Sequence, residues 1–258
     1  MKVALLQTDI AWNNPASNVR SAREIATAAV QRGARALVFP EMFTSGFSLP
    51  TGELAIESGA KGRELLAEIA QKQNVYTIGS LPESGESGQL YNTAHIFTPT
   101  GASYSYRKVH LFSYGEETSK YAPGSSALTV TMDDIRCTLF ICYDLRFPIP
   151  FAKRAKETDV FVVVANWPST RREHWLTLLR ARAIETQAYV VGVNRVGEGG
   201  GLRYSGDSMA FAPDGTPLTD PVSVEATLFA EIDSKKVAEW RETFPALRDR
   251  RDDVYESM

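Results

Sequence analysis

The stretch Ile135-Arg-Cys-Thr-Leu-Phe-Ile-Cys142-Tyr-Asp-Leu-Arg-Phe-Pro148 decides how the rest of the sequence is interpreted. Its first half is apolar and β-prone, which predicts a buried strand. Cys142 ends that strand, and Pro148 suits the first turn of a helix. A thiol at the carboxyl end of a core strand lies where α/β folds place reactive groups. Exposed backbone N–H groups can lower its pKa there from the free value of about 8.5.

For Cys142 alone, a small core residue is the better explanation, because free cysteine is among the most buried residue types. Two other stretches reverse that preference. Ala36-Leu-Val-Phe-Pro-Glu41-Met-Phe is a second apolar strand, and it brings a carboxylate to its end. Tyr104-Ser-Tyr-Arg-Lys108-Val-His-Leu-Phe112 is an alternating strand that carries a cation. A base, a cation and a thiol near strand ends are the groups that thiol-based acyl transfer needs.

Three segments also carry a family resemblance: FPEMF around Glu41, RKVHLF around Lys108 and CYDLRFP around Cys142. They resemble the signature segments of the nitrilase (carbon–nitrogen hydrolase) superfamily, and the resemblance extends over essentially the whole chain. Within the superfamily the chain is most similar to the ω-amidase branch. The resemblance implies an α/β fold, a four-layer α-β-β-α sandwich of two packed mixed sheets. It makes Glu41 the general base, Lys108 the oxyanion-stabilising cation and Cys142 the nucleophile, and the residue types agree with those roles.

A second glutamate fits the same resemblance. In the family, a glutamate lies between the lysine and the cysteine, in the loop before a Pro-Gly, and Glu117-Thr-Ser-Lys-Tyr-Ala-Pro-Gly124 matches that position. Its role would be to orient Lys108 and the substrate nitrogen. The neighbouring Glu116 leaves the assignment open by one residue, with Glu117 favoured. The alternative is that both are loop carboxylates in water.

Length and composition are those of an ordinary globular protein. Of 258 residues, 43% are hydrophobic and 23% charged, and we predict one domain over 1–258 with a charged tail from about Leu247. A net charge of -3 gives no electrostatic reason to expect nucleic acid or an anionic membrane as a partner. No stretch approaches the roughly 20 apolar residues of a membrane span, and the N-terminus is interpreted as a first strand.

The cysteines and histidines narrow the chemistry further. Cys137 and Cys142 lie on opposite faces of one strand, so no disulfide between them is expected, which suits a reducing cytoplasm. His95, His110 and His174 show no metal-ligand spacing, so no metal and no other cofactor is expected.

Strands are expected to alternate with helices, with hairpins in the middle of the chain. A pocket-rim loop is predicted over 44–59, a helix over 62–73, a polar turn over 81–88 and a loop over 198–201. Ser234 is predicted to cap the last helix. The expected strands are 3–8, 36–39, 75–80, 90–97, 102–109, 127–132, 135–141, 159–165, 189–193, 207–212 and 226–232.

Aromatic residues are the candidates for the pocket wall. Trp167 follows a strand expected to run parallel to the nucleophile strand, so it should border the pocket, although a core position is a nearly equal alternative. Phe43, Tyr114 and Tyr143 are further candidates, and the backbone N–H of Tyr143 is a candidate oxyanion donor.

An arginine is the candidate for holding a substrate carboxylate through paired hydrogen bonds. Arg146, Arg171 and Arg172 are close in sequence to the candidate wall residues, and the sequence leaves the choice among the three arginines open. For Arg171 and Arg172 a surface position is the more common explanation.

The ω-amidase resemblance implies the reaction and the assembly. The substrates would be small dicarboxylic monoamides such as 2-oxoglutaramate and 2-oxosuccinamate, hydrolysed through a thioester to the 2-oxo acid and ammonia by a homodimer. An N-carbamoyl amino acid hydrolase, another aliphatic amidase or a nitrilase would keep the same nucleophile. A non-catalytic small-molecule binding protein on the same scaffold is the alternative from another class.

Overall fold

The computed structural model describes residues 1–255. In this range one sheet has the strand order β13-β1-β2-β3-β4-β5 and another the order β12-β9-β8-β7-β6. Both are mixed, because the neighbours β1, β2 and β3 run parallel, as do β7, β8 and β9, while the flanking strands are antiparallel. The strands of the first sheet are β1 (Lys2–Gln7), β2 (Ala36–Val38), β3 (Tyr76–Ser84), β4 (Leu90–Phe97), β5 (Ser103–Arg107) and β13 (Ala226–Glu231). Those of the second are β6 (Thr129–Met132), β7 (Ile135–Ile141), β8 (Val160–Ala165), β9 (Tyr189–Asn194) and β12 (Met209–Phe211).

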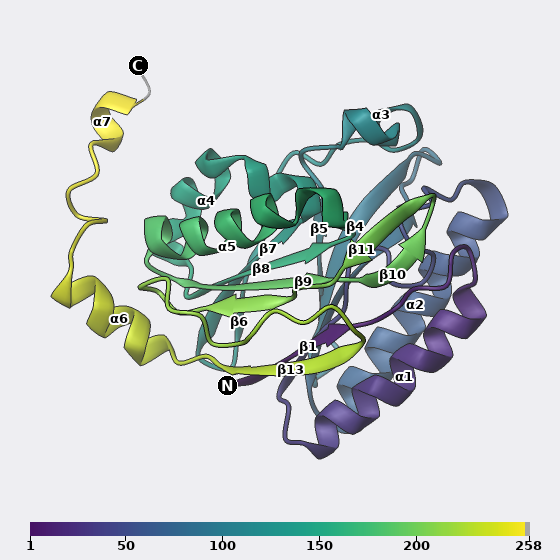
Figure 1. Ribbon diagram of the computed structural model, residues 1–258, viewed down its shortest axis with the longest axis horizontal. Helices are drawn as coiled ribbons and strands as arrows, with labels where there is room; N and C mark the ends of the chain where they lie inside the picture. The colour runs from purple at the N-terminus through teal and green to yellow at the C-terminus, as the bar shows by residue number, and fades with distance from the viewer. Residues whose placement is uncertain (256–258) are drawn as a thin grey trace.

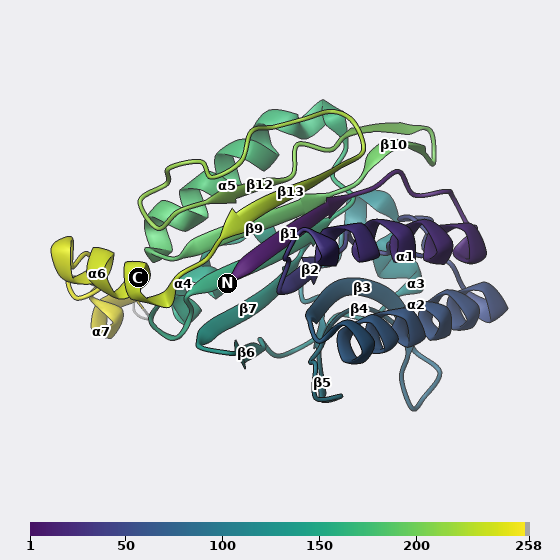
Figure 2. The same cartoon turned by 90° about the horizontal axis from the view of Figure 1, so that it is seen from below.

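Helices cover the outer face of each sheet. α1 (Pro15–Gln31) and α2 (Gly52–Gln73) lie on the first sheet, and α4 (Pro148–Arg154) and α5 (Arg172–Thr186) lie on the second. Figure 2 shows the resulting layers, with α5 and α1/α2 on opposite sides of the two sheets. The predicted four-layer α-β-β-α sandwich is confirmed.

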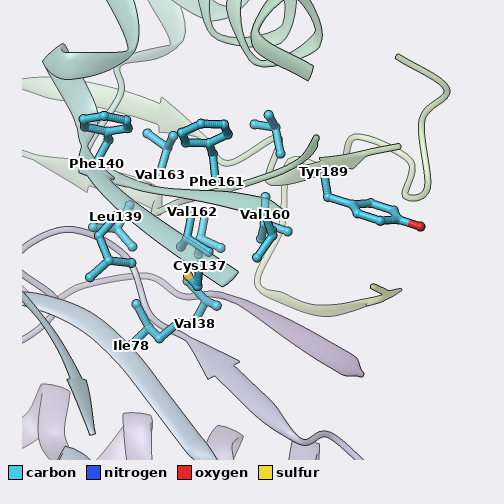
Figure 3. Packing of buried hydrophobic residues seen from close by; sticks show 14 of the residues in the cluster. Val38, Ile78, Cys137, Leu139, Phe140, Val160, Phe161, Val162, Val163 and Tyr189 are labelled. Carbon is cyan, nitrogen blue, oxygen red and sulfur yellow. The ribbon is translucent and has the colours of Figure 1, made fainter. Parts of the chain in front are cut away.

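Side chains from the facing sheets fill the centre of the sandwich. Figure 3 shows Cys137, Val160 and Val162 pointing toward Val38 and Ile78 of the other sheet. The opposite face of β7 and β8 points toward the helices and carries Phe140, Phe161 and Val163. Both faces are therefore buried, which explains why the sequence of β8 is continuously apolar.

The structure corrects the predicted loop over 44–59, because α2 begins at Gly52. Glycine's low helix propensity favoured a loop here, but packing explains two of the glycines. A Cβ at Gly59 would lie 2.3 Å from the carbonyl oxygen of Pro82, and one at Gly62 would lie 2.2 Å from the Leu81 side chain. Glycine therefore lets α2 approach β3 closely. The predicted polar turn is also shorter, because β3 continues to Ser84, which pairs with Leu90.

Two further predictions were wrong in detail. Asp233, not Ser234, caps α6 (Ser234–Thr243), because its carboxylate accepts a hydrogen bond from the Lys235 N–H, while the Ser234 hydroxyl donates to Asp134. The expected loop over 198–201 is instead the end of a hairpin, formed by β10 (Val196–Gly199) and β11 (Leu202–Ser205).

The C-terminal segment leads away from the sandwich. Figure 1 shows α6 and the short helix α7 (Asp252–Tyr255) extending past one end of the sheets. Leu247, where the tail was predicted to begin, is buried, and the last residues of that tail, 256–258, lie outside the described residues. Within the described chain, no helix combines the length and the apolar character that crossing a membrane requires.

Candidate active site

Cys142 lies at a sharp turn between β7 and a short 3₁₀ segment, η2 (Cys142–Arg146). Its φ of +44° is in the left-handed region, which is costly for a residue with a side chain and is found mainly where surrounding structure enforces it. The Asp144 carboxylate is part of that enforcement. Its Oδ2 accepts hydrogen bonds from the Ile141 N–H at 3.0 Å and from the Tyr106 hydroxyl at 2.8 Å.

The other oxygen of Asp144 ties this turn to the segment after β5. Oδ1 accepts a hydrogen bond from the His110 N–H at 2.9 Å and lies 2.8 Å from His110 Nδ1. The His110 ring also stacks on Phe147, with ring centroids 3.9 Å apart. One buried carboxylate therefore sets the cysteine turn relative to the chain that carries Lys108.

Lys108 is completely buried between two carboxylates. Its Nζ lies 3.0 Å from Glu41 Oε1 and 2.8 Å from Glu117 Oε2. Asn92 on β4 holds this cluster together, because its carbonyl accepts from the Lys108 N–H at 2.9 Å and its Nδ2 donates to Glu41 at 2.8 Å and to Glu117 at 3.2 Å. Asn92 was not among the residues predicted from the sequence, although a side-chain amide in a buried strand is a usable signal of a functional residue.

Glu41 follows β2 and is tied to the other sheet. Its Oε2 accepts a hydrogen bond at 2.8 Å from the N–H of Asn166, the residue that follows β8. The Asn166 side-chain amide in turn donates to the Glu41 carbonyl. Asn166 was not among the predicted site residues, even though it directly precedes Trp167.

The structure distinguishes between the two neighbouring glutamates. Glu117 begins α3 (Glu117–Lys120), is completely buried, and its Oε2 also accepts a hydrogen bond from the Phe112 N–H at 2.7 Å. Glu116 is exposed, with a left-handed φ of +63°. It is therefore Glu117 that reaches Lys108.

Burial and charge within the cluster shift the pKa values of Lys108 and Cys142. Burial opposes the charge on Lys108, but the carboxylates of Glu117 and Glu41 outweigh it and raise the lysine pKa. Burial, followed by the negative charge of Glu41, raises the pKa of the Cys142 thiol well above its usual value, although Lys108 opposes this shift. The prediction of a lowered thiol pKa is therefore wrong, because desolvation dominates over exposed backbone N–H groups.

A cavity opens beside Cys142. Cys142 lines it together with Tyr143, Arg146 and Trp167. The Trp167 indole is buried, and its Nε1 donates a hydrogen bond to the Arg171 carbonyl at 2.8 Å. These three predicted pocket residues therefore share one wall with the thiol.

Two predicted wall residues lie elsewhere. Phe43 is buried in the core of the first sheet, stacked on Phe39 with centroids 4.8 Å apart, because the chain turns sharply at Met42, where φ is +47°. Tyr114 is 88% exposed. The aromatic side chains that line the cavity in their place are Phe47, Phe112 and Tyr204.

The structure also separates the three candidate arginines. Arg172 is held by Asp207 through two hydrogen bonds of 2.9 and 3.0 Å and does not line the cavity. Arg146 and Arg171 do line it. The Arg146 guanidinium lies 4.7 Å from the Trp167 ring centroid, and neither lining arginine has an acidic partner within residues 1–255. The charged side chains of the cavity wall are therefore cationic.

No group of three or more His, Cys, Asp or Glu side chains in the described part of the chain is arranged to hold a metal ion.

The sandwich fold agrees with comparisons to known proteins. The chain belongs to the carbon–nitrogen hydrolase family, whose model matches residues 2–242. It is 36% identical over 251 residues to omega-amidase YafV of Escherichia coli (strain K12), covering 96% of each chain. It is 34% identical over 256 residues to 2-oxoglutaramate amidase of Bacillus subtilis (strain 168), covering 98% of each.

A solved structure gives the same result. XC1258 from Xanthomonas campestris, a CN-hydrolase superfamily protein with an arsenic adduct in its active site, superimposes with a TM-score of 0.86. Its sequence is 33% identical, and the match covers 98% of this chain and 97% of that one. The resemblance predicted from the three signature segments is confirmed.

Proposed function

We propose that the protein is an ω-amidase that hydrolyses the terminal amide of small dicarboxylic monoamides, such as 2-oxoglutaramate and 2-oxosuccinamate. The observation that carries this proposal is the buried cluster of Glu41, Lys108 and Glu117 beside Cys142, which itself lines a cavity with a cationic wall. The similarity to enzymes named omega-amidase and 2-oxoglutaramate amidase over nearly the full chain supports the same substrate class.

Charge balance supports Glu41 as the general base. With two carboxylates, one ammonium and a neutral thiol, the cluster carries a net charge of about -1. Losing the thiol proton to water would place a second net negative charge in a buried site. Passing that proton to Glu41 leaves the total unchanged, so the thiolate forms as it attacks the substrate.

The reaction then follows from the positions of these groups. The Cys142 sulfur attacks the amide carbon, and the oxyanion is stabilised by Lys108 and the backbone N–H of Tyr143. Glu41 donates the proton to the departing ammonia as the C–N bond breaks and a thioester forms. Glu41 next takes a proton from water as the water oxygen attacks the thioester. The C–S bond breaks, Glu41 returns this proton to the departing Cys142 sulfur, and the acid and the free thiol are released. Glu117 holds Lys108 in place throughout.

The far end of the substrate carries a carboxylate, for which the cavity wall offers guanidinium groups. Arg146 and Arg171 lack acidic partners in the described chain, so they are available for charge-assisted hydrogen bonds. Trp167 and Tyr143 supply apolar surface for the short carbon chain. The combination favours an anionic amide over a neutral one of similar size.

A substrate panel tests the proposal. Ammonia release is measured with 2-oxoglutaramate, glutamine, an N-carbamoyl amino acid and a simple nitrile. The proposal predicts the highest kcat/KM for 2-oxoglutaramate. A preference for the N-carbamoyl substrate, which also releases carbon dioxide, or for the nitrile would replace it with one of the other hydrolase activities. An absence of turnover, together with stoichiometric binding of an amide, would favour a binding protein.

We also propose that the protein works as a cytoplasmic homodimer. Isoleucines exposed on the outer helices support a subunit contact there, namely Ile149 on α4 and Ile184 on α5, which are 66% and 51% exposed. Light scattering coupled to size exclusion tests this: a mass of about twice 28.5 kDa is expected, and a monomer would contradict it.

A further inference from the structure

Tyr204, on the β10–β11 hairpin, is a pocket residue that the proposed mechanism does not use. It lies on β11, lines the cavity that also contains Cys142, and is only 3% exposed. The Arg195 guanidinium lies 4.6 Å from its ring centroid, and Arg195 is itself buried and bonded to Asp9 and to the Val196 and Glu198 carbonyls. Arg195 therefore holds the Tyr204 ring in position from the side that faces away from the cavity.

The hydroxyl of Tyr204 is available to a ligand. No group in residues 1–255 forms a hydrogen bond with its Oη, and this oxygen is not among the buried polar atoms that lack a partner there. It therefore keeps accessible surface, and since the residue borders the cavity and is otherwise covered, that surface faces the cavity. A polar atom this enclosed is normally paired, which makes a substrate atom the natural partner.

The phenol is a donor at neutral pH. Burial, which outweighs the opposing charge of Arg195, raises the pKa of Tyr204 to about 12, so the O–H remains protonated. Two other N–H donors of the cavity wall are already engaged, since Trp167 Nε1 donates to the Arg171 carbonyl and Asn166 Nδ2 to the Glu41 carbonyl. The Tyr143 hydroxyl is also unpaired in the described chain, but its side chain is only half-buried and accessible to water.

A 2-oxo monoamide has three polar groups to satisfy. The proposed mechanism assigns its amide carbonyl to Lys108 and the Tyr143 N–H, and its carboxylate to Arg146 and Arg171. The 2-oxo oxygen lies between these groups in the substrate and remains without a partner. Tyr204 lines the same cavity as Cys142 and Arg171, and β11 packs against the segment that ends at Arg171, η4 (Ser169–Arg171), which makes its hydroxyl the candidate partner for that oxygen.

We infer that the Tyr204 hydroxyl donates a hydrogen bond to the 2-oxo oxygen of the substrate and so selects 2-oxo monoamides over monoamides without that group. This inference rests on the proposed function. It makes Tyr204 a specificity-determining residue that contacts substrate without taking part in bond making or breaking.

The test compares two substrates that differ at this one position. Wild-type, Tyr204→Phe and the control Tyr104→Phe are assayed for ammonia release from 2-oxosuccinamate and from succinamate, which has a methylene in place of the oxo group. Tyr104 lies on β5, is 42% exposed and does not line the cavity, so its variant controls for loss of a hydroxyl elsewhere. Thermal unfolding checks that both variants are folded.

Tyr204→Phe is expected to lose about three- to tenfold in kcat/KM for 2-oxosuccinamate, the range of one neutral hydrogen bond, with little change for succinamate. An equal loss for both substrates, or no loss, would overturn the inference while leaving the amidase proposal intact. Wild-type enzyme that hydrolyses both substrates equally well would also overturn it, whether or not the variant folds. Wild-type enzyme that hydrolyses neither would overturn both proposals.

Discussion

Lys108 and Glu41, which are 67 residues apart in the chain, form an ion pair of 3.0 Å in which neither side chain is exposed. Such a pair is costly to bury and gains little stability over apolar packing, so its presence close to the cavity-lining Cys142 favours a chemical role. Glu117 adds a second carboxylate to the same ammonium.

Lys108→Met should lose far more in kcat than in substrate affinity, because the ammonium acts mainly on the charge that develops in the transition state. The expected loss in kcat is about 100-fold or more, comparable to removing an oxyanion donor. The variant also leaves Glu41 and Glu117 without a cation, which should cost about 3–5 kcal/mol of unfolding free energy. Steady-state kinetics with chemical denaturation measures both, and equal losses in kcat and affinity would contradict the assigned role.

Glu117→Gln and Glu116→Gln form a matched pair of variants. Both remove one carboxylate from neighbouring positions, but only Glu117 is buried against Lys108, whereas Glu116 is exposed. Glu117→Gln should lose about 10- to 100-fold in kcat, in line with loss of a hydrogen bond between charged groups. Glu116→Gln should behave as wild-type. The reverse order of effects would show that the assignment is off by one residue.

Arg146→Met should weaken only the binding of the substrate's carboxylate. We expect KM for 2-oxoglutaramate to rise about tenfold or more, because a charge-assisted hydrogen bond is lost. Butanamide, which has no carboxylate, should show little change and serves as the internal control. If both substrates lose equally, Arg146 stabilises the pocket through its stacking on Trp167, and Arg171 alone remains as the carboxylate partner.

The raised thiol pKa predicts a pH-dependent contribution to stability. The folded protein holds the Cys142 proton at pH values where the unfolded chain, with a cysteine pKa of about 8.5, has released it. The contribution is therefore complete below about pH 8.5 and is lost as pH rises further. Between pH 7 and pH 10 the wild-type Tm should fall more than that of Cys142→Ala. Parallel Tm curves for the two proteins would indicate an ordinary thiol.

The parts of the fold that the sequence predicted are those with a strong local pattern. The apolar run ending at Ile141 is an example, since it is β-prone and is followed by the helix-start signal at Pro148. The start of α2 was missed because Gly52 and Gly59 resemble a loop until the neighbouring strand is known.

The candidate site likewise contains residues that the sequence could predict and residues that it could not. Residues within signature segments, such as Glu41, Lys108 and Cys142, could be predicted by type and position. Asn166 and Tyr204 could not, because their importance depends on contacts between distant parts of the chain. The direction of the Cys142 pKa shift was also missed, since it depends on how completely the folded protein removes water from the sulfur.

The most direct test of the account is to detect the acyl group on Cys142 itself. Wild-type protein is mixed with 2-oxoglutaramate, quenched in acid within the first turnovers and analysed by intact mass and peptide mapping, with Cys142→Ala as the control. We predict a substrate-derived acyl group attached to Cys142, removable by hydroxylamine, and a folded variant with neither adduct nor ammonia release. Ammonia release by Cys142→Ala at the wild-type rate would contradict the central claim.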